Sequence, residues 1–182
     1  MTQKPPVQPL GPEQYHEPVI SDDQILLIGQ VIVAWSKLEA AMEDTIWMLL
    51  NLEEDDGRLV TKRLGADAKI QLLRLIGPKN IEDDTLQTEF LDWLKVIDEL
   101  KEVRNFIAHG VWGTLMPDDV PVALSLKPQA EAGEVISETF PRERMIATSE
   151  GIQSMLRNLI ALPENIGRPR RVPDGCNFLG MD

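Results

Sequence analysis

Cysteine is almost absent from this sequence, and so are other features that define large classes of protein. Cys176 is the single cysteine, so no disulfide framework can form within the chain and a reducing compartment fits. No uninterrupted apolar run reaches the ~18 residues of a membrane helix. The polar, proline-rich N-terminal stretch does not resemble a signal peptide. We therefore expect a soluble, cytoplasmic protein with no membrane partner.

Basic residues are also few. The chain has 18 Lys and Arg against 30 Asp and Glu, which gives a formal net charge of −12 and a sequence pI of about 4.6. Proteins that coat nucleic acid are basic, so we exclude broad electrostatic binding and expect no DNA partner. A small positive patch that serves one RNA partner remains compatible with this balance. Arg168-Pro-Arg-Arg171 is a basic cluster, and a solvated charge run is a better interpretation of it than an RNA-touching tail.

The sequence also lacks a set of side chains spaced to bind a metal ion. Metal enzymes built in helical bundles need spaced inward carboxylates, often as Glu-x-x-His pairs, and the chain has no such pair. Glu39, Glu43 and Asp44 lie close together, but Glu43 and Asp44 turn away from the apolar stripe of their helix. The acidic stretch 53–57 lacks the spaced ligands of a calcium loop, so we interpret it as a solvated turn. We therefore expect no metal site and no cofactor.

What the sequence does contain is helical periodicity. With 43% hydrophobic residues, the chain suits one domain with a substantial core. Ser21-Asp-Asp-Gln24 has the form of a capping box and predicts a helix from about Asp22 to Leu50. Glu39 falls inside the apolar stripe of this helix. Its carboxylate is either solvated at the edge of the stripe or faces Arg104 of a later helix.

Shorter helices are expected next along the chain. One covers about 58–64 and another about 66–76, and Gly77-Pro78 should end the second of these. Lys69 and Arg74 are expected on its outer, solvated side.

Beyond Gly110 the spacing of hydrophobic residues changes from a helical pattern to one typical of strands. Strands are expected at 120–126 and 135–140, joined by a turn at 130–133 as a small hairpin. A last helix follows Pro141 and runs to about Leu162, although Gly151 weakens its pattern. This predicts a mostly α-helical bundle of four to five helices with a hairpin insertion at about 120–140. The expected organisation is a flexible proline-rich arm (1–20, with a solvated His16), one helical domain (21–162) and a flexible or draped tail (163–182).

The stretch Leu100-Lys-Glu-Val-Arg-Asn-Phe-Ile-Ala-His-Gly110 carries the candidate chemistry. It ends a helix that begins at about residue 84. At 100° per residue, Arg104 falls in the middle of the apolar stripe and not on the solvated side. Asn105 and His109 lie one turn apart at the edge of that stripe, and the closing glycine suits a left-handed C-terminal cap. A guanidinium, an amide and an imidazole thus gather at one helix end.

The residues Arg104-Asn105-x-x-x-His109 resemble the R-x(4–6)-H signature of HEPN domains, in which a polar residue often follows the arginine. The resemblance extends back to Trp35-Ser36-Lys37-Leu38-Glu39 and covers roughly 21–162. It implies a HEPN-like helical bundle, a homodimer and, as in many members, a metal-independent endoribonuclease. It also implies single-stranded or looped RNA as the substrate. The family's common settings add a toxin or phage-defence role and a cognate antitoxin or regulator.

The residue types fit that chemistry. Attack of a ribose 2′-hydroxyl on the neighbouring phosphate needs a proton carrier near neutral pH and a cation for the charged transition state. His109 supplies the first, because imidazole changes charge in that range, and Arg104 supplies the second through bidentate phosphate contacts. Asn105 would orient the imidazole or bind the phosphate, with Glu39 and Lys101 in supporting positions. The alternative is an inactive HEPN-like scaffold or RNA- or nucleotide-binding protein, in which Arg104 pairs with Glu39 inside the bundle.

One geometric problem remains in this hypothesis. In an ideal helix, Arg104 and His109 point about 140° apart. A single copy brings them together only if the helix unwinds near Ala108, whereas the family's dimers are understood to join two helix ends in one cleft. Three aromatic residues off the main apolar stripes are therefore the expected interface contacts: Trp47, Phe106 and Trp112.

Overall fold

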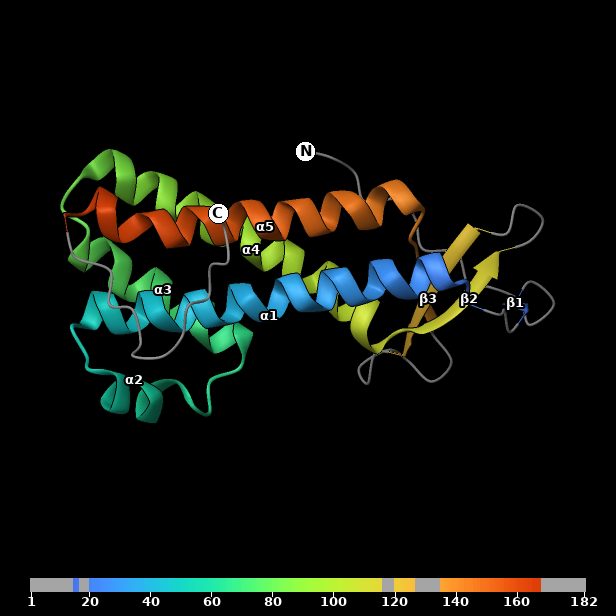
Figure 1. The fold of residues 1–182 in the computed structure, drawn as a ribbon, viewed down its shortest axis with the longest axis horizontal. Helices are drawn as coiled ribbons and strands as arrows, with labels where there is room; N and C mark the ends of the chain where they lie inside the picture. The colour runs from blue at the N-terminus through green and yellow to red at the C-terminus, as the bar shows by residue number, and fades with distance from the viewer. Residues whose placement is uncertain (1–14, 17–19, 116–119, 127–134, 168–182) are drawn as a thin grey trace. The chain divides into compact units, whose positions relative to one another are not determined.

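The computed structural model describes residues 15–16, 20–115, 120–126 and 135–167. This part of the chain is a mostly α-helical bundle, which confirms the expected fold class. The helices are α1 (Asp22–Leu50), α2 (Glu54–Thr61), α3 (Ala66–Asn80), α4 (Asp84–His109) and α5 (Arg142–Asn165). The strands are β1 (Tyr15–His16), β2 (Val111–Leu115), β3 (Val120–Leu126) and β4 (Val135–Thr139) (Figure 1).

The chain forms two compact units. Unit 1 comprises residues 1–34 and 100–151, and unit 2 comprises residues 35–99 and 152–182. Helices α1, α4 and α5 each contribute one part to each unit. The predicted single domain over 21–162 stays a prediction.

Local capping residues fix the starts of the two longest helices. The Ser21 hydroxyl accepts a hydrogen bond from the backbone N–H of Gln24, and the Gln24 side chain accepts one from the backbone N–H of Ser21. At the start of α4, Asp83 Oδ1 accepts from the backbone N–H of Leu86 at 2.7 Å. Both caps were readable from the sequence, and both helices begin where the caps predict.

The sheet of unit 1 contains the predicted hairpin and two strands that the sequence analysis missed. Strands β3 and β4 pair antiparallel, with Val122 opposite Thr139, while the turn predicted at 130–133 lies outside the described residues. Strand β2 pairs with β3 on its other edge, and β1 pairs with β2 through the register of His16 with Thr114. The strand order is β1-β2-β3-β4. Part of the arm expected to be flexible therefore joins the sheet.

Unit 1 brings α4 and α5 close together through a glycine. A Cβ at Gly151 would lie 3.3 Å from the Leu100 side chain, so the missing side chain allows the approach. Helix α5 continues through this position, which explains a glycine that weakened the sequence pattern. The buried residues of unit 1 include Leu27, Val31, Ala34, Ile107, Ala123, Phe140 and Met145.

In unit 2, α2 lies beside the C-terminal half of α1 (Figure 1). The Trp47 indole N–H donates to the Thr61 hydroxyl at 3.1 Å, and the ring covers the buried Gly57. The prediction of a solvated acidic turn at 53–57 was wrong, because α2 begins at Glu54. Three acidic residues in the first turn favour a helix there, since they complement the positive end of its dipole.

Helix α3 is longer than predicted, and two of its cations, Lys69 and Arg74, are not on the solvated side. It continues past Gly77-Pro78 to Asn80, because Gly77 is buried against the Phe90 ring and does not serve as a C-terminal cap. Lys69 is only 5% exposed, so its expected solvated position was wrong. Arg74 is half-buried and pairs with Asp98 at 3.1 Å. Carboxylates from α1 and α4 offset the desolvation of these cations.

Helix α1 is long and apolar enough to cross a membrane when it is judged by length and composition alone. Its most apolar window is 39% buried, and core helices of soluble proteins pass the same test. The cytoplasmic location stays a prediction.

Candidate functional site

The C-terminal end of α4 is a polar site built on a regular helix in unit 1. Helix α4 remains helical through His109, and the backbone N–H of Gly110 donates to the Phe106 carbonyl at 2.9 Å. The Trp112 indole N–H then donates to the Ile107 carbonyl at 3.1 Å. These bonds satisfy two of the carbonyls that a helix end leaves without helical partners. The site therefore stands on a capped, well-formed helix terminus.

Arg104 and Asn105 are in direct contact at this end. The Arg104 Nη1 donates to the Asn105 Oδ1 at 3.1 Å in a half-buried setting, and the Nε of Arg104 is buried. The amide orients the guanidinium and carries no charge, so this contact does not neutralise it. Asn105 was predicted to orient the imidazole or bind phosphate. The structure gives its oxygen to Arg104, and the Nδ2 group has no hydrogen-bond partner within the described residues.

His109 is exposed at the last position of the helix. Its ring makes no hydrogen bond within the part of the chain that the structure describes. An imidazole in this position is open to solvent and to a ligand. It can accept or donate a proton without first breaking an internal contact.

Charge changes sign along α4. Residues 84–99, which belong to unit 2, hold five carboxylates and one lysine. Residues 100–109, which belong to unit 1, hold a single carboxylate, Glu102, with Lys101, Arg104 and His109. Lys101 is 6% exposed and its Nζ lies 3.3 Å from Glu102 Oε1. Counted along the helix alone, residues 100–109 thus hold two cations and one carboxylate, in contrast to the acidic segment before them.

The helix direction keeps Arg104 and His109 apart within one copy. Residues five apart on an α-helix point about 140° away from each other. Unwinding near Ala108 would have brought them together, but Ala108 is part of α4. A site that uses both groups on one phosphate therefore needs a second copy of the chain or a ligand that wraps around the helix end.

Glu39, the predicted supporting carboxylate, lies in unit 2 and has partners there. Its Oε2 accepts from the Trp35 indole N–H at 2.9 Å, and its Oε1 lies 3.5 Å from Lys69 Nζ. Lys69 also pairs with Glu43 at 2.6 Å. These contacts account for a half-buried Glu39 without an arginine. The predicted pair with Arg104 stays a prediction.

The predicted interface aromatics have roles within each unit. Trp47 donates a hydrogen bond to Thr61, as described, and the Trp112 ring packs at a tilt of 52° against Phe140, with centroids 5.5 Å apart. Both are half-buried, so neither is the exposed aromatic that was expected. Phe106 makes neither a ring contact nor a side-chain hydrogen bond within the described residues. The bond from the Trp112 indole to the Ile107 carbonyl was not predicted from the sequence.

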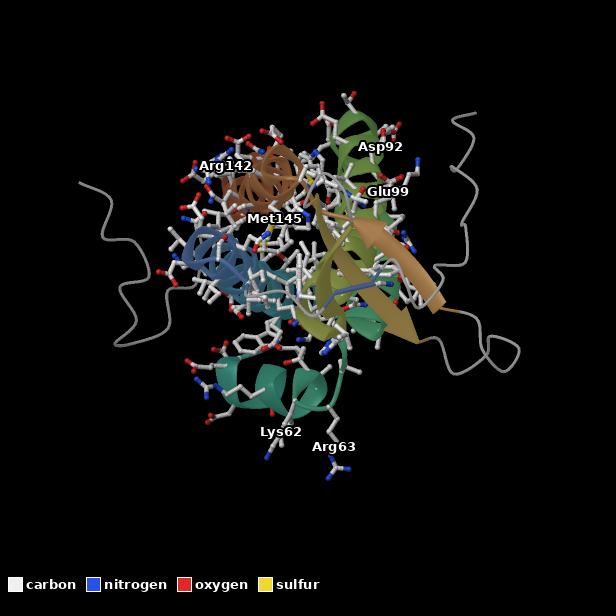
Figure 2. The ribbon with its side chains drawn as sticks, turned by 90° about the vertical axis from the view of Figure 1, so that its right-hand side faces the viewer. Lys62, Arg63, Asp92, Glu99, Arg142 and Met145 are labelled. Carbon is white, nitrogen blue, oxygen red and sulfur yellow. The ribbon has the colours of Figure 1, made fainter. Side chains whose placement is uncertain are left out.

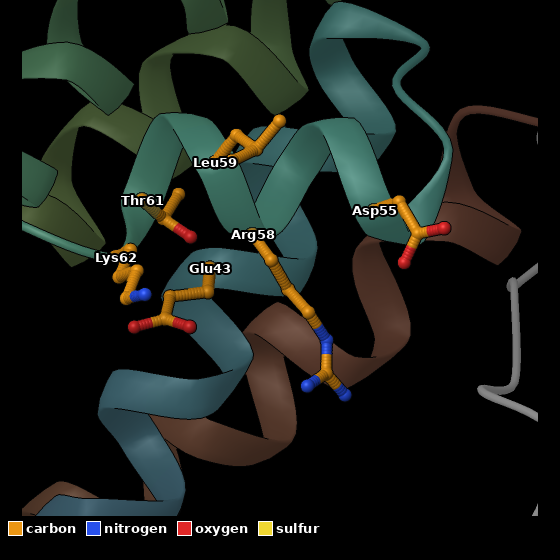
Figure 3. Close-up of a pocket in the computed structure, with 6 residues that line it drawn as sticks. All are labelled: Glu43, Asp55, Arg58, Leu59, Thr61 and Lys62. Carbon is orange, nitrogen blue, oxygen red and sulfur yellow. The ribbon is translucent and has the colours of Figure 1, made fainter.

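A pocket of about 360 Å³ lies between α1 and α2 in unit 2 (Figure 3). Charges of both signs line it, from Glu43, Asp55, Arg58 and Lys62. Glu43 already pairs with Lys69, and Arg58 with Glu54. Figure 2 shows Lys62 and Arg63 extending away from α2. No single ligand chemistry is favoured by this lining.

Neither a metal site in the described part of the chain nor a known relative identifies this protein. Within the described residues, no group of three or more His, Cys, Asp or Glu side chains could hold a metal ion, and Cys176 lies outside those residues. No family model, no curated protein and no solved structure matches this chain. Function must therefore be argued from the residues themselves.

Proposed function

We propose that this chain is a metal-independent endoribonuclease of the HEPN type that acts on single-stranded or looped RNA. The observation that carries the proposal is the contact of Arg104 with Asn105 at the capped end of α4, together with the exposed His109. The local excess of cations in residues 100–109 supports a phosphate ligand there, even though the protein is acidic. The sequence signature supports the family.

The proposed reaction is attack of the ribose 2′-oxygen on the adjacent phosphorus. The new bond joins the 2′-oxygen to phosphorus, and the bond from phosphorus to the 5′-oxygen breaks. The proton leaves the 2′-hydroxyl and a proton is delivered to the 5′-oxygen, which gives a cyclic phosphate and a 5′-hydroxyl. Imidazole suits both transfers near neutral pH, and a guanidinium suits the charge on the phosphoryl oxygens. Asn105 holds that guanidinium in position.

The proposed active species is a homodimer that joins two α4 ends. One copy keeps Arg104 and His109 apart, as described, so the arginine of one copy would serve the phosphate beside the histidine of the other. Light scattering at tens of micromolar is the direct test. A monomer that still cleaves RNA would remove the composite site.

Incubation of the purified protein with RNA, in the presence of a chelator, tests the activity. We expect cleavage products that end in cyclic phosphate. Matched RNA with deoxyribose at the cleaved positions should stay intact, because it lacks the attacking hydroxyl. Cleavage of this control would exclude the mechanism. A cytoplasmic toxin or phage-defence role with a cognate antitoxin or regulator belongs to the same proposal, and co-purification from the native host tests it.

A catalytically inactive HEPN-like RNA- or nucleotide-binding scaffold is the second candidate. The net charge of −12 favours it, because an enzyme acting on a polyanion gains from a positive surface. Binding of RNA without any cleavage, with or without cell extract, would select this alternative.

A further inference from the structure

The described phenylalanines differ in one respect. Phe90 and Phe140 are both 0% exposed, and each has an aromatic partner, Trp93 and Trp112 respectively. Arg144 also lies over the Phe140 ring, 4.5 Å from its centroid. Phe106 is half-buried and has no ring contact within the described residues. An aromatic side chain that is partly open and lacks a ring partner is available for stacking.

Phe106 lies beside His109 and away from Arg104. Residues three apart on a helix are neighbours, with Cβ atoms about 5–6 Å apart, and Phe106 stands in that relation to His109. The same geometry places Phe106 about 160° from Arg104. The half-buried ring therefore lies on the same side of the helix end as the exposed imidazole.

We propose that Phe106 is a stacking platform for an unpaired nucleobase next to the phosphate that His109 serves. Every base offers a π-face, so such a platform selects unpaired bases without reading their sequence. A base within a duplex is already stacked on its neighbours and cannot reach the ring. This inference rests on the proposed function, and it specifies the substrate as RNA with at least one unstacked base at the cleavage position.

Binding of an RNA analogue that cannot be cleaved tests the platform without any catalysis. The probe is a short, single-stranded 2′-O-methyl oligonucleotide with a fluorescent label, compared with the same backbone lacking its bases. Fluorescence anisotropy gives both dissociation constants. We expect the wild-type protein to bind the base-bearing probe about 5- to 150-fold more tightly, the range that stacking of one base supports.

Three variants make the comparison specific. Phe106→Leu keeps an apolar side chain of similar size and should lose the preference for bases, with little change in affinity for the abasic probe. Phe106→Trp should keep or increase the preference. Leu75→Ala removes a 65% exposed side chain from α3 in unit 2 and is the matched control, which should keep the wild-type ratio.

The outcomes separate this inference from the proposed function. An unchanged ratio in Phe106→Leu, or no binding of either probe by the wild-type protein, would overturn the platform. Cleavage of RNA by Phe106→Leu with an unchanged KM would also overturn it while the ribonuclease stands. Base-dependent binding that needs Phe106, without cleavage of any RNA, would support the platform and remove the catalytic proposal.

Discussion

The two units use their buried cations differently. In unit 2, Lys69 lies between the carboxylates of Glu39 and Glu43, so its charge is neutralised by its surroundings. In unit 1, Arg104 donates to the neutral oxygen of Asn105, and His109 beside it is exposed. The first arrangement ties α1 to α3 through paired charges, whereas in the second a neutral amide oxygen orients the guanidinium. The difference separates residues that hold the fold from residues that are suited to a ligand.

The largest expected effect is a loss of RNA cleavage in a variant that keeps the stability of the fold. His109→Ala should lower the rate of RNA cleavage by roughly 10²–10⁴, the usual worth of a positioned proton carrier. Its melting temperature should match the parent, because the exposed ring makes no hydrogen bond within the described residues. His16→Ala makes the same change at the other histidine and should keep the rate. Full activity in His109→Ala would refute the proposed mechanism.

Arg104→Lys tests whether cleavage needs the guanidinium of Arg104 or only a positive charge at this position. The variant keeps the charge and loses the planar fork that matches phosphate and holds Asn105. We therefore expect Arg104→Lys to lose RNA cleavage although it keeps the positive charge. Recovery of the parent rate would show that a point charge suffices.

The next largest effect breaks unit 2. Lys69→Met should lower the free energy of unfolding by about 2–4 kcal/mol, because Glu39 and Glu43 lose the cation that offsets their desolvation. The carboxylates are partly exposed, which keeps the cost below that of a fully buried network. Lys95→Met is the matched control. It breaks an exposed pair with Asp92 and should change stability by less than about 0.5 kcal/mol.

Two glycines sharpen the comparison at the level of packing. Gly77→Ala places a methyl group on the Phe90 ring and should destabilise by about 1–3 kcal/mol. Gly29→Ala, in the unit 1 part of α1, has nothing within 4 Å of the added atom and should stabilise by up to about 1 kcal/mol. Denaturant unfolding measures both. The same sign for the two variants would contradict the packing described here.

The smallest expected effect is the change in stability of Glu39→Ala, which tests which cation pairs with Glu39. Glu39→Ala should cost about 1–2 kcal/mol, because Lys69 keeps Glu43 and the Trp35 indole loses its acceptor. In double-mutant cycles we expect coupling with Lys69, whose Nζ lies 3.5 Å from Glu39 Oε1. A strong coupling with Arg104 would establish the alternative pair and favour the scaffold.

The sequence predicted the features that depend on neighbours along the chain. The starts of α1 and α4 follow from caps within three residues, and the end of α4 at His109 follows from the helical pattern. The left-handed cap expected at Gly110 was wrong, because among the described glycines Gly167 has the positive φ. The local contact of Arg104 with Asn105 sits where the pattern placed it, although the amide was assigned a different partner.

The features that were missed depend on residues far apart in the sequence. Lys69 was predicted to be solvated because its carboxylate partner Glu39 is 30 residues away on another helix. Gly77 was interpreted as a helix end because its contact with Phe90 has no local signal. Strand β1 was missed because two residues of a polar arm pair with Thr114 and Leu115 only in the folded chain. A local pattern carries none of this information.

We expect the division of the chain into two discontinuous units to order its folding during synthesis. Most of unit 2 comes from the continuous segment 35–99, whose contacts are short in sequence and can form early. Unit 1 joins the segment before Ala34 to the segment after Leu100, and its ion pair between Asp23 and Arg142 spans 119 residues. We expect the nascent chain to carry a structured unit 2 before the end of α4 has its packing partners. A ribosome-bound fragment that stops at Gly110 would then hold every proposed catalytic residue and still be inactive.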